Sequence, residues 1–77
     1  MTLQDEVLAG LVNNAINQDK RLAGQAIAVR VANGDVFLKG IVDTEEDKNL
    51  AHLVAGGVAG TRQVIVEELR VKEAPNE

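Results

Sequence analysis

Residues 25–42 decide the fold, and they read QAIAVRVANGDVFLKGIV. On both sides of Asn33-Gly34, aliphatic residues alternate with other residues, which is the period of a half-buried β-strand. Asn-Gly is the pair most typical of a two-residue hairpin turn, because both central residues of a type I′ turn need a positive φ. The stretch therefore predicts an antiparallel hairpin with strands over residues 25–32 and 35–42.

The alternation gives this hairpin two faces. One face should lie against the helices, and it carries Ile27, Val29, Val31, Val36 and Leu38. The opposite face is more apolar than a solvated sheet needs and also carries basic residues. With one residue from a third strand, the candidate surface for a lipid or protein partner is Ala28, Arg30, Phe37, Lys39, Ile41 and Ile65. Scattered exposed apolar residues are also normal on protein surfaces, so the pattern alone leaves both interpretations open.

Two amphipathic helices are predicted on either side of the hairpin. The first covers residues 3–18, with Thr2 as its N-cap and Asp5 in the place of the capping-box Glu. Its apolar residues recur every three or four positions, at Val7, Leu8, Leu11, Val12, Ala15 and Ile16. The second begins after Thr44, and its apolar stripe, with Leu53 at the edge, is Leu50, Ala51, Val54, Ala55 and Val58. Gly56-Gly57 weakens the end of this helix, and Gly60 is expected to terminate it.

A third strand is predicted over residues 62–71. Val64 and Val66 share one phase of its alternation, whereas Leu69 and Val71 share the other. One extra residue near Glu67-Glu68 would return both pairs to the same face, which predicts a β-bulge there. The order is thus helix, strand, strand, helix, strand, in one domain over residues 1–71, followed by a flexible tail or linker over residues 72–77.

Composition excludes several classes of function. The chain has 77 residues and no cysteine, so it has room for one core and lacks disulfides, iron–sulfur clusters and thiol nucleophiles. Phe37 is the only aromatic residue and the net charge is −4, both of which argue against a nucleic-acid partner. No apolar stretch is long enough to span a bilayer.

The sequence offers no convincing catalytic or metal site. His52 is the only histidine and should be partly exposed, without a nucleophile beside it. Asp43, Glu45, Glu46 and Asp47 lack EF-hand spacing and are better explained as acids at a helix start. Residues 57–60 match the GXXG pattern of KH domains, but their apolar centre favours a glycine-rich helix exit. We therefore expect no enzyme activity, no metal site and no cofactor, although potassium on backbone carbonyls would leave no side-chain pattern.

The chain resembles the BON domain (bacterial OsmY and nodulation domain) family over nearly its whole length. The most specific part is Ile27-x-Val29-x-Val31-x-Asn33-Gly34-x-Val36-x-Leu38-x-Gly40-x-Val42. Weaker matches lie in or just after the two helices and in the third strand, at Val12, Ala15, Ile16, Asp19, Leu22, Ala51, Val54, Ala55, Val58, Gly60, Val64, Glu67, Leu69 and Val71. Lys20 departs from the family pattern, which often has Pro there, and the spacing from Gly60 to Leu69 is one residue longer than usual.

The resemblance implies an α+β fold, αββαβ, with two helices packed on one face of a three-stranded mixed sheet. Structural roles are expected for Asn33 and Gly34 in the turn and for Gly60 at the end of the second helix. The resemblance adds Gly40, the hallmark position of the family, which we interpret as a strand site that a helix backbone approaches closely. No catalytic residue set belongs to the family.

The function implied by the resemblance is a non-enzymatic module that binds phospholipid or a membrane surface, in envelope and osmotic-stress proteins of bacteria. The net charge of −4 weakens attraction to anionic lipid. The alternative is a regulatory or protein-interaction domain of a larger protein, which senses a small ligand or potassium. Self-association through the apolar sheet face is open as well. The resemblance points to the cell envelope or periplasm, whereas a native start at Met1 would point to the cytoplasm.

Overall fold

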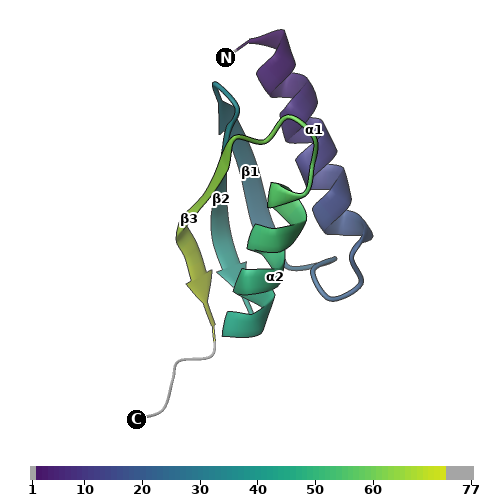
Figure 1. Cartoon of the computed structure of the whole chain (residues 1–77). Coiled ribbons are helices and arrows are strands. Elements are labelled where there is room, and N and C mark those ends of the chain that lie inside the picture. The colour runs from purple at the N-terminus through teal and green to yellow at the C-terminus, as the bar shows by residue number, and fades with distance from the viewer. Residues whose placement is uncertain (1, 73–77) are drawn as a thin grey trace.

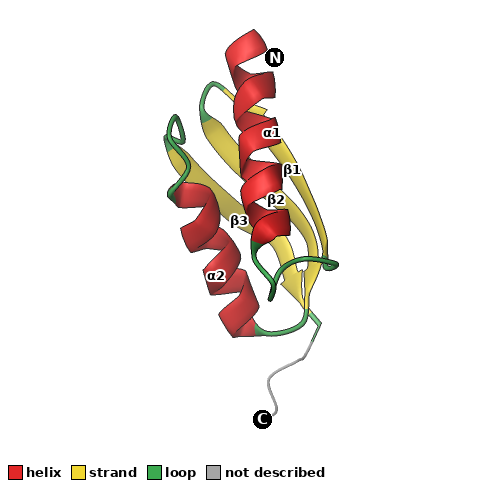
Figure 2. Cartoon of the chain, turned by 90° about the vertical axis from the view of Figure 1, so that its right-hand side faces the viewer, coloured by secondary structure: helices red, strands yellow, loops and turns green. Residues whose placement is uncertain are grey.

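The computed structural model describes residues 2–72. Its elements follow in the order α1 (Leu3–Gln18), β1 (Ala26–Ala32), β2 (Asp35–Val42), α2 (Glu45–Gly56) and β3 (Gln63–Val71) (Figure 1). The strands form one sheet in the order β1-β2-β3, with β1 antiparallel and β3 parallel to β2. Both helices cover the same face of this mixed sheet (Figure 2). The predicted α+β fold and its element order are confirmed.

The Asn33-Gly34 turn has the predicted geometry. Asn33 has φ 55° and Gly34 has φ 83°, so both central residues adopt the positive φ of a type I′ turn. The two strands then pair without interruption from Ala32 opposite Asp35 to Ala26 opposite Ile41. Because the side-chain period of a strand is two, this register places the predicted inward set on the helix side, namely Ile27, Val29, Val31, Val36 and Leu38.

The predicted bulge in the third strand is present. Phe37 pairs with Ile65 and Lys39 pairs with Glu68, so two β3 residues, Val66 and Glu67, lie opposite one β2 residue. The extra residue returns Leu69 to the core side, where it is buried. The bulge therefore reconciles the two phases of alternation in the sequence.

The core lies between the sheet and the helices and contains only small and aliphatic side chains. Its buried members are Leu8, Val12, Ile16, Leu22, Val31, Val36, Leu38, Val42, Ala51, Ala55 and Leu69. None of the helices in the described residues is long and apolar enough to cross a membrane.

The buried stripe on the first helix is narrower than the sequence predicted. Leu8, Val12 and Ile16 are buried, but Val7 is 55% exposed and Leu11 is 50% exposed. These two residues follow Leu3 on a neighbouring flank of α1, at a spacing of four residues. A three-stranded sheet shared with α2 covers one flank of α1 and leaves the other uncovered.

The second helix begins as predicted but ends earlier. The Thr44 hydroxyl accepts the Asp47 N–H at 3.1 Å, which is the expected N-cap. The helix ends at Gly56 rather than Gly60, because the Gly57 N–H donates to the carbonyls of Leu53 and Val54 and closes the last turn. Leu53 is 70% exposed and so lies outside the buried stripe, not at its edge.

The role expected for Gly40 is half right. Its φ is +140°, and a Cβ atom there would overlap the backbone carbonyl oxygen of Ala26. The close approach therefore comes from the backbone of neighbouring strand β1 and not from a helix. Gly60 lies in the loop before β3 with φ +102°, which likewise favours glycine.

The predicted tail lies outside the described residues except for Lys72. The backbone N–H of Lys72 donates to the Val42 carbonyl at 2.7 Å, which extends the pairing of β2 and β3 beyond Val71.

Candidate binding surfaces

The sheet face away from the helices brings together all six residues of the predicted partner surface. Arg30, Phe37 and Ile65 form one row across the three strands, and Ala28, Lys39 and Glu68 form the next. Ile41, which is 50% exposed, lies in the following row between Ala26 and Arg70. We call this surface the open sheet face.

The centre of the open sheet face is a stacked pair of side chains. The Arg30 guanidinium carbon lies 4.4 Å from the centroid of the Phe37 ring, within the range of a cation–π interaction. A shallow pocket of about 200 Å³ adjoins this pair and is lined by Arg30, Phe37, Leu38, Ile65, Glu67 and Glu68. The stack covers part of the Phe37 ring, so it lowers the apolar exposure that the sequence suggested for this face.

Charge is distributed unevenly between the sheet and the rest of the chain. The strands carry three of the eight basic residues and three of the twelve acidic ones, so the excess of acid lies elsewhere. On the open sheet face, Arg30, Lys39 and Arg70 accompany Glu67 and Glu68. Asp35 is the third acidic residue of the strands, and its Oδ1 lies 3.9 Å from the Arg62 Nε. The open sheet face thus carries three basic and two acidic side chains on a protein whose net charge is −4.

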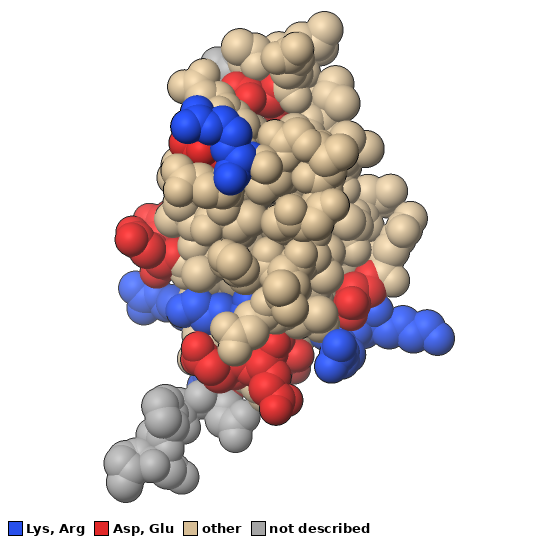
Figure 3. All heavy atoms as spheres, in the orientation of Figure 1, with Lys and Arg blue, Asp and Glu red and all other residues tan. Residues whose placement is uncertain are grey.

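A second surface was missed by the sequence reasoning. It is a groove of about 710 Å³ between the N-terminal half of α1 and the loop after α2. Leu3, Val7 and Leu11 line one side, and Ala59 and Gly60 line the other. In the view of Figure 3, a broad area without charged side chains lies over the second half of α2, the loop after it and the adjacent part of α1. We call this the α1 groove.

The signal for the α1 groove was present in the sequence but was assigned to the core. Leu3, Val7 and Leu11 repeat every four residues, as do Leu8, Val12 and Ile16. One helix can present two such rows, and only tertiary packing decides which row is covered.

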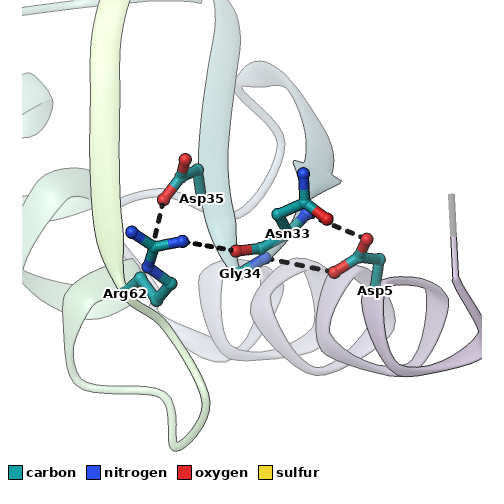
Figure 4. Close-up of polar contacts among 5 residues, drawn as sticks. All are labelled: Asp5, Asn33, Gly34, Asp35 and Arg62. Atoms are coloured by element: carbon teal, nitrogen blue, oxygen red, sulfur yellow. Dashed lines mark hydrogen bonds and ion pairs between the residues drawn. The ribbon is translucent and has the colours of Figure 1, made fainter.

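Asp5 connects α1 to the hairpin turn at the end of the α1 groove. Its carboxylate accepts the backbone N–H groups of Asn33 at 2.9 Å and Gly34 at 3.1 Å (Figure 4). The Asp5 N–H donates to the Thr2 hydroxyl at 3.1 Å, which completes the predicted capping box. The capping residue is therefore also a long-range clamp, which no local pattern indicated.

The electrostatics of Asp5 follow from these contacts. The hydrogen bond from Asn33 is the largest influence and lowers the pKa of the Asp5 carboxyl, whereas its partial burial raises that pKa. Further hydrogen bonds from Gly34 and Thr2 lower it again, and the resulting pKa lies below the ordinary value. The backbone N–H groups of Thr2, Asn33 and Gly34 all donate to this carboxylate, and such hydrogen bonds stabilise the ionised form more than the neutral acid.

Arg62 holds the other side of the same turn. Its backbone N–H donates to the Gly34 carbonyl at 2.8 Å, and its Nη1 donates to the Asn33 carbonyl at 3.3 Å. Together Asp5 and Arg62 satisfy both the donors and the acceptors of the turn (Figure 4). The hairpin tip is thus a structural junction of α1, β1, β2 and β3.

The remaining candidates from the sequence stay apart. His52 is exposed on α2, and within residues 2–72 no three His, Asp or Glu side chains gather where a metal ion could be held. Glu45, Glu46 and Asp47 form the first turn of α2. Residues 57–60 form the loop between α2 and β3, so the GXXG pattern is a helix exit with a strand after it.

Comparison with known proteins identifies the family. A search of curated proteins gave no match. The family model described as BON domain matches residues 4–73, a range that contains the last four turns of α1 and all later elements. The match covers most of the chain and agrees with the observed αββαβ order, so this chain belongs to the BON domain family.

Proposed function

We propose that this BON domain is a non-enzymatic binding module that contacts phospholipid membranes through its open sheet face. The observation that carries the proposal is the stacked Arg30–Phe37 pair in an apolar row, with Lys39 in the next row. Apolar side chains with basic neighbours suit the boundary between acyl chains and phosphate groups. The family match supports a binding role in general.

The charges of the face set the strength of the contact. Each basic residue near an anionic membrane contributes about 1 kcal/mol, and this contribution falls off within a Debye length. Glu67 and Glu68 offset part of the attraction from Arg30, Lys39 and Arg70. We therefore expect weak binding that requires anionic lipid and decreases as salt is added.

Vesicle flotation tests this proposal. Wild-type protein should float with phosphatidylcholine vesicles that contain phosphatidylglycerol, and much less with phosphatidylcholine alone. The double variant Arg30→Gln/Lys39→Gln should lose this binding. The control Lys20→Gln/Arg21→Gln removes the same charges from the exposed loop after α1 and should keep it. Absence of binding to both vesicle types, or equal loss in the two variants, would contradict the proposal.

The α1 groove supports a second candidate function, which is docking of another protein domain. Leu3, Val7 and Leu11 are half or more exposed, whereas the helix that carries them has no Lys or Arg. The residues that line the groove also include one base, Arg62, and one acid, Asp5, so the groove carries no excess of positive charge. A largely apolar surface of this kind suits a protein partner better than an anionic membrane.

Site-specific photocrosslinking in the native host tests the second candidate. A photoreactive side chain at Val7 and at Leu11 should give the same protein adduct, and one at Leu53 should not. Leu53 is the matched control, because it is a large apolar residue that is 70% exposed, more than Val7 or Leu11, and does not line the groove. If Val7 and Leu11 give no adduct, or share theirs with Leu53, the groove does not dock a protein.

A further inference from the structure

The Asn33-Gly34 turn has a chemical reactivity that its structural role does not use. In an Asn-Gly pair, the glycine backbone nitrogen can attack the carbonyl carbon of the asparagine side chain, and glycine has no side chain to obstruct that approach. Asparagine is therefore among the thermally labile residues of proteins. The chain contains no other Asn-Gly pair, and Asn33 is exposed to water. The hairpin tip is thus the place where this chain is most susceptible to deamidation.

The fold nevertheless requires glycine at the second position of this pair. Gly34 has φ +83°, and a Cβ atom there would lie 3.0 Å from both the Cγ and the Cδ of Arg62. Any other residue would be strained in its backbone and crowded by the arginine side chain. The turn therefore needs the pair that deamidates most readily, and protection has to come from the structure around it.

The peptide group between Asn33 and Gly34 is held at both of its polar atoms (Figure 4). Its N–H donates to the Asp5 Oδ1 at 3.1 Å, and its carbonyl oxygen accepts from the Arg62 Nη1 at 3.3 Å. This peptide group has to rotate and lose its N–H proton before the Gly34 nitrogen can bond to the Asn33 Cγ. The two hydrogen bonds oppose the rotation, and the negative charge of Asp5 opposes removal of the proton.

We propose that Asn33 is a deamidation site that Asp5 and Arg62 protect, and that it reacts when the first turn of α1 separates from the hairpin tip. The deprotonated Gly34 nitrogen forms a bond to the Asn33 Cγ, the bond from Cγ to Nδ2 breaks, and the leaving group takes up a proton and departs as ammonia. Water then opens the cyclic succinimide. Cleavage of the new bond leaves an aspartate at position 33, whereas cleavage of the original main-chain bond leaves an isoaspartate. The reaction consumes water, releases ammonia and involves no oxidation or reduction.

The modification weakens the connection between α1 and the hairpin. Either product puts a carboxylate on the residue whose N–H is bonded to Asp5, and two carboxylates in one place disfavour each other's ionised form. The isoaspartate also adds a carbon atom to the main chain of a two-residue turn, whose length sets the register of Ala32 opposite Asp35. Asn33 and Gly34 line the α1 groove, so deamidation is a one-way switch on the shape of that groove. This inference goes beyond the proposed function and does not depend on it.

Mass spectrometry of the tryptic peptide over residues 31–39, taken after incubation of the whole chain at mildly alkaline pH, measures the reaction. Folded wild type should deamidate much more slowly than wild type in guanidinium chloride. Folded Asp5→Asn should react about tenfold faster than folded wild type, because loss of a charged hydrogen bond increases the open fraction of the turn. In guanidinium chloride the two chains should react at equal rates, since the contacts exist only in the folded state. Equal rates for the two folded proteins overturn the proposal.

Gln25→Ala is the control for a general loss of stability. Its hydrogen bonds go to Arg21, Asp43 and Asp47 and not to the turn, so this variant weakens the fold but keeps the contacts of Asp5. Circular dichroism confirms that both variants fold. Gln25→Ala should deamidate at close to the wild-type rate, and an acceleration equal to that of Asp5→Asn would overturn the protective role of Asp5.

The effect on the fold is measured on the deamidated wild-type chain, which anion exchange separates by its additional negative charge. Its thermal unfolding midpoint should lie several degrees below that of the unmodified chain. An unchanged midpoint would overturn the conclusion that deamidation acts as a switch.

Discussion

The carboxylate of Asp5 accepts the backbone N–H of Asn33 at 2.9 Å and so fastens the first turn of α1 to the tip of the β1–β2 hairpin. The two residues lie 28 positions apart in the chain. A type I′ turn directs its N–H groups away from the strands, and in a small domain these donors need an acceptor. Asp5 is short enough to serve this turn and its own helix cap together.

The first prediction concerns this clamp. Asp5→Asn replaces one carboxylate oxygen with an NH₂ donor, so one N–H of the Asn33-Gly34 turn loses its acceptor. We expect the thermal unfolding midpoint, measured by circular dichroism, to fall by several degrees. Glu6→Gln is the matched control, because it removes the same charge from the same turn of α1 at an exposed position. It should change stability by no more than about 0.5 kcal/mol. Equal midpoints for the two variants would show that the clamp does not stabilise the fold.

The second prediction is a pH dependence with a defined sign. Folding lowers the pKa of the Asp5 carboxyl, which means that the ionised carboxylate stabilises the folded state relative to the unfolded state. This stabilisation is fully present above the unfolded pKa, for which the ordinary value is 3.8. It is lost as pH falls through the lower, folded pKa. Urea unfolding from about pH 6 to about pH 3 should therefore show wild type and Asp5→Asn converging at the acid end. Parallel pH profiles would contradict the assignment.

The elements of the fold were predictable because their signals are local. The Asn33-Gly34 turn, the Thr2 and Thr44 caps and the break in phase along β3 each depend on a few neighbouring residues. The end of α2 was a local error, whereas the wrong expectations for Gly40 and for the flank of α1 at Val7 and Leu11 concern neighbours far away in the chain. At Gly40, a glycine within a strand indicated that another backbone lies close, but the sequence did not show whether that backbone belongs to a helix or to a neighbouring strand.

The candidate site divides in the same way. Alternation along the strands correctly placed Arg30, Phe37 and Ile65 on one face, because strand parity is a local property. The exposure of Val7 and Leu11 was not predictable from the helix alone, since it depends on where α2 and its following loop lie. The double role of Asp5 also required the tertiary fold, since a capping residue gives no local sign of a distant partner.

The third prediction concerns Gln25, which connects the loop after α1 to the start of α2. Its Oε1 accepts the Asp43 N–H at 2.7 Å. Its Nε2 donates to the Arg21 carbonyl at 2.6 Å and to the Asp47 carboxylate at 3.1 Å. Gln25→Ala removes all three contacts and should lower the free energy of unfolding by about 1–2 kcal/mol.

Urea denaturation measures this change, with Gln18→Ala as the control. Gln18 is exposed at the end of α1, so its replacement should have an effect within about 0.5 kcal/mol. A Gln25→Ala variant as stable as the control would mean that the connection adds no net stability.

The fourth prediction contrasts two glycines that carry opposite constraints. Gly40 has φ +140°, and a Cβ atom there would overlap the Ala26 carbonyl oxygen. Gly40→Ala must therefore strain the backbone and also separate β1 from β2. Gly10 lies on the exposed side of α1, and a Cβ atom there would have no neighbour within 4 Å.

We expect Gly40→Ala to reduce the free energy of unfolding by about 4 kcal/mol or more, enough to unfold much of a domain of this size. Gly10→Ala should instead raise it by about 0.5–1 kcal/mol, because alanine favours the helix. Both variants add the same methyl group, so urea unfolding of the pair separates a steric requirement at Gly40 from a general effect of glycine replacement. If Gly40→Ala unfolds at the wild-type urea concentration, β1 does not press on Gly40 as closely as the structure indicates.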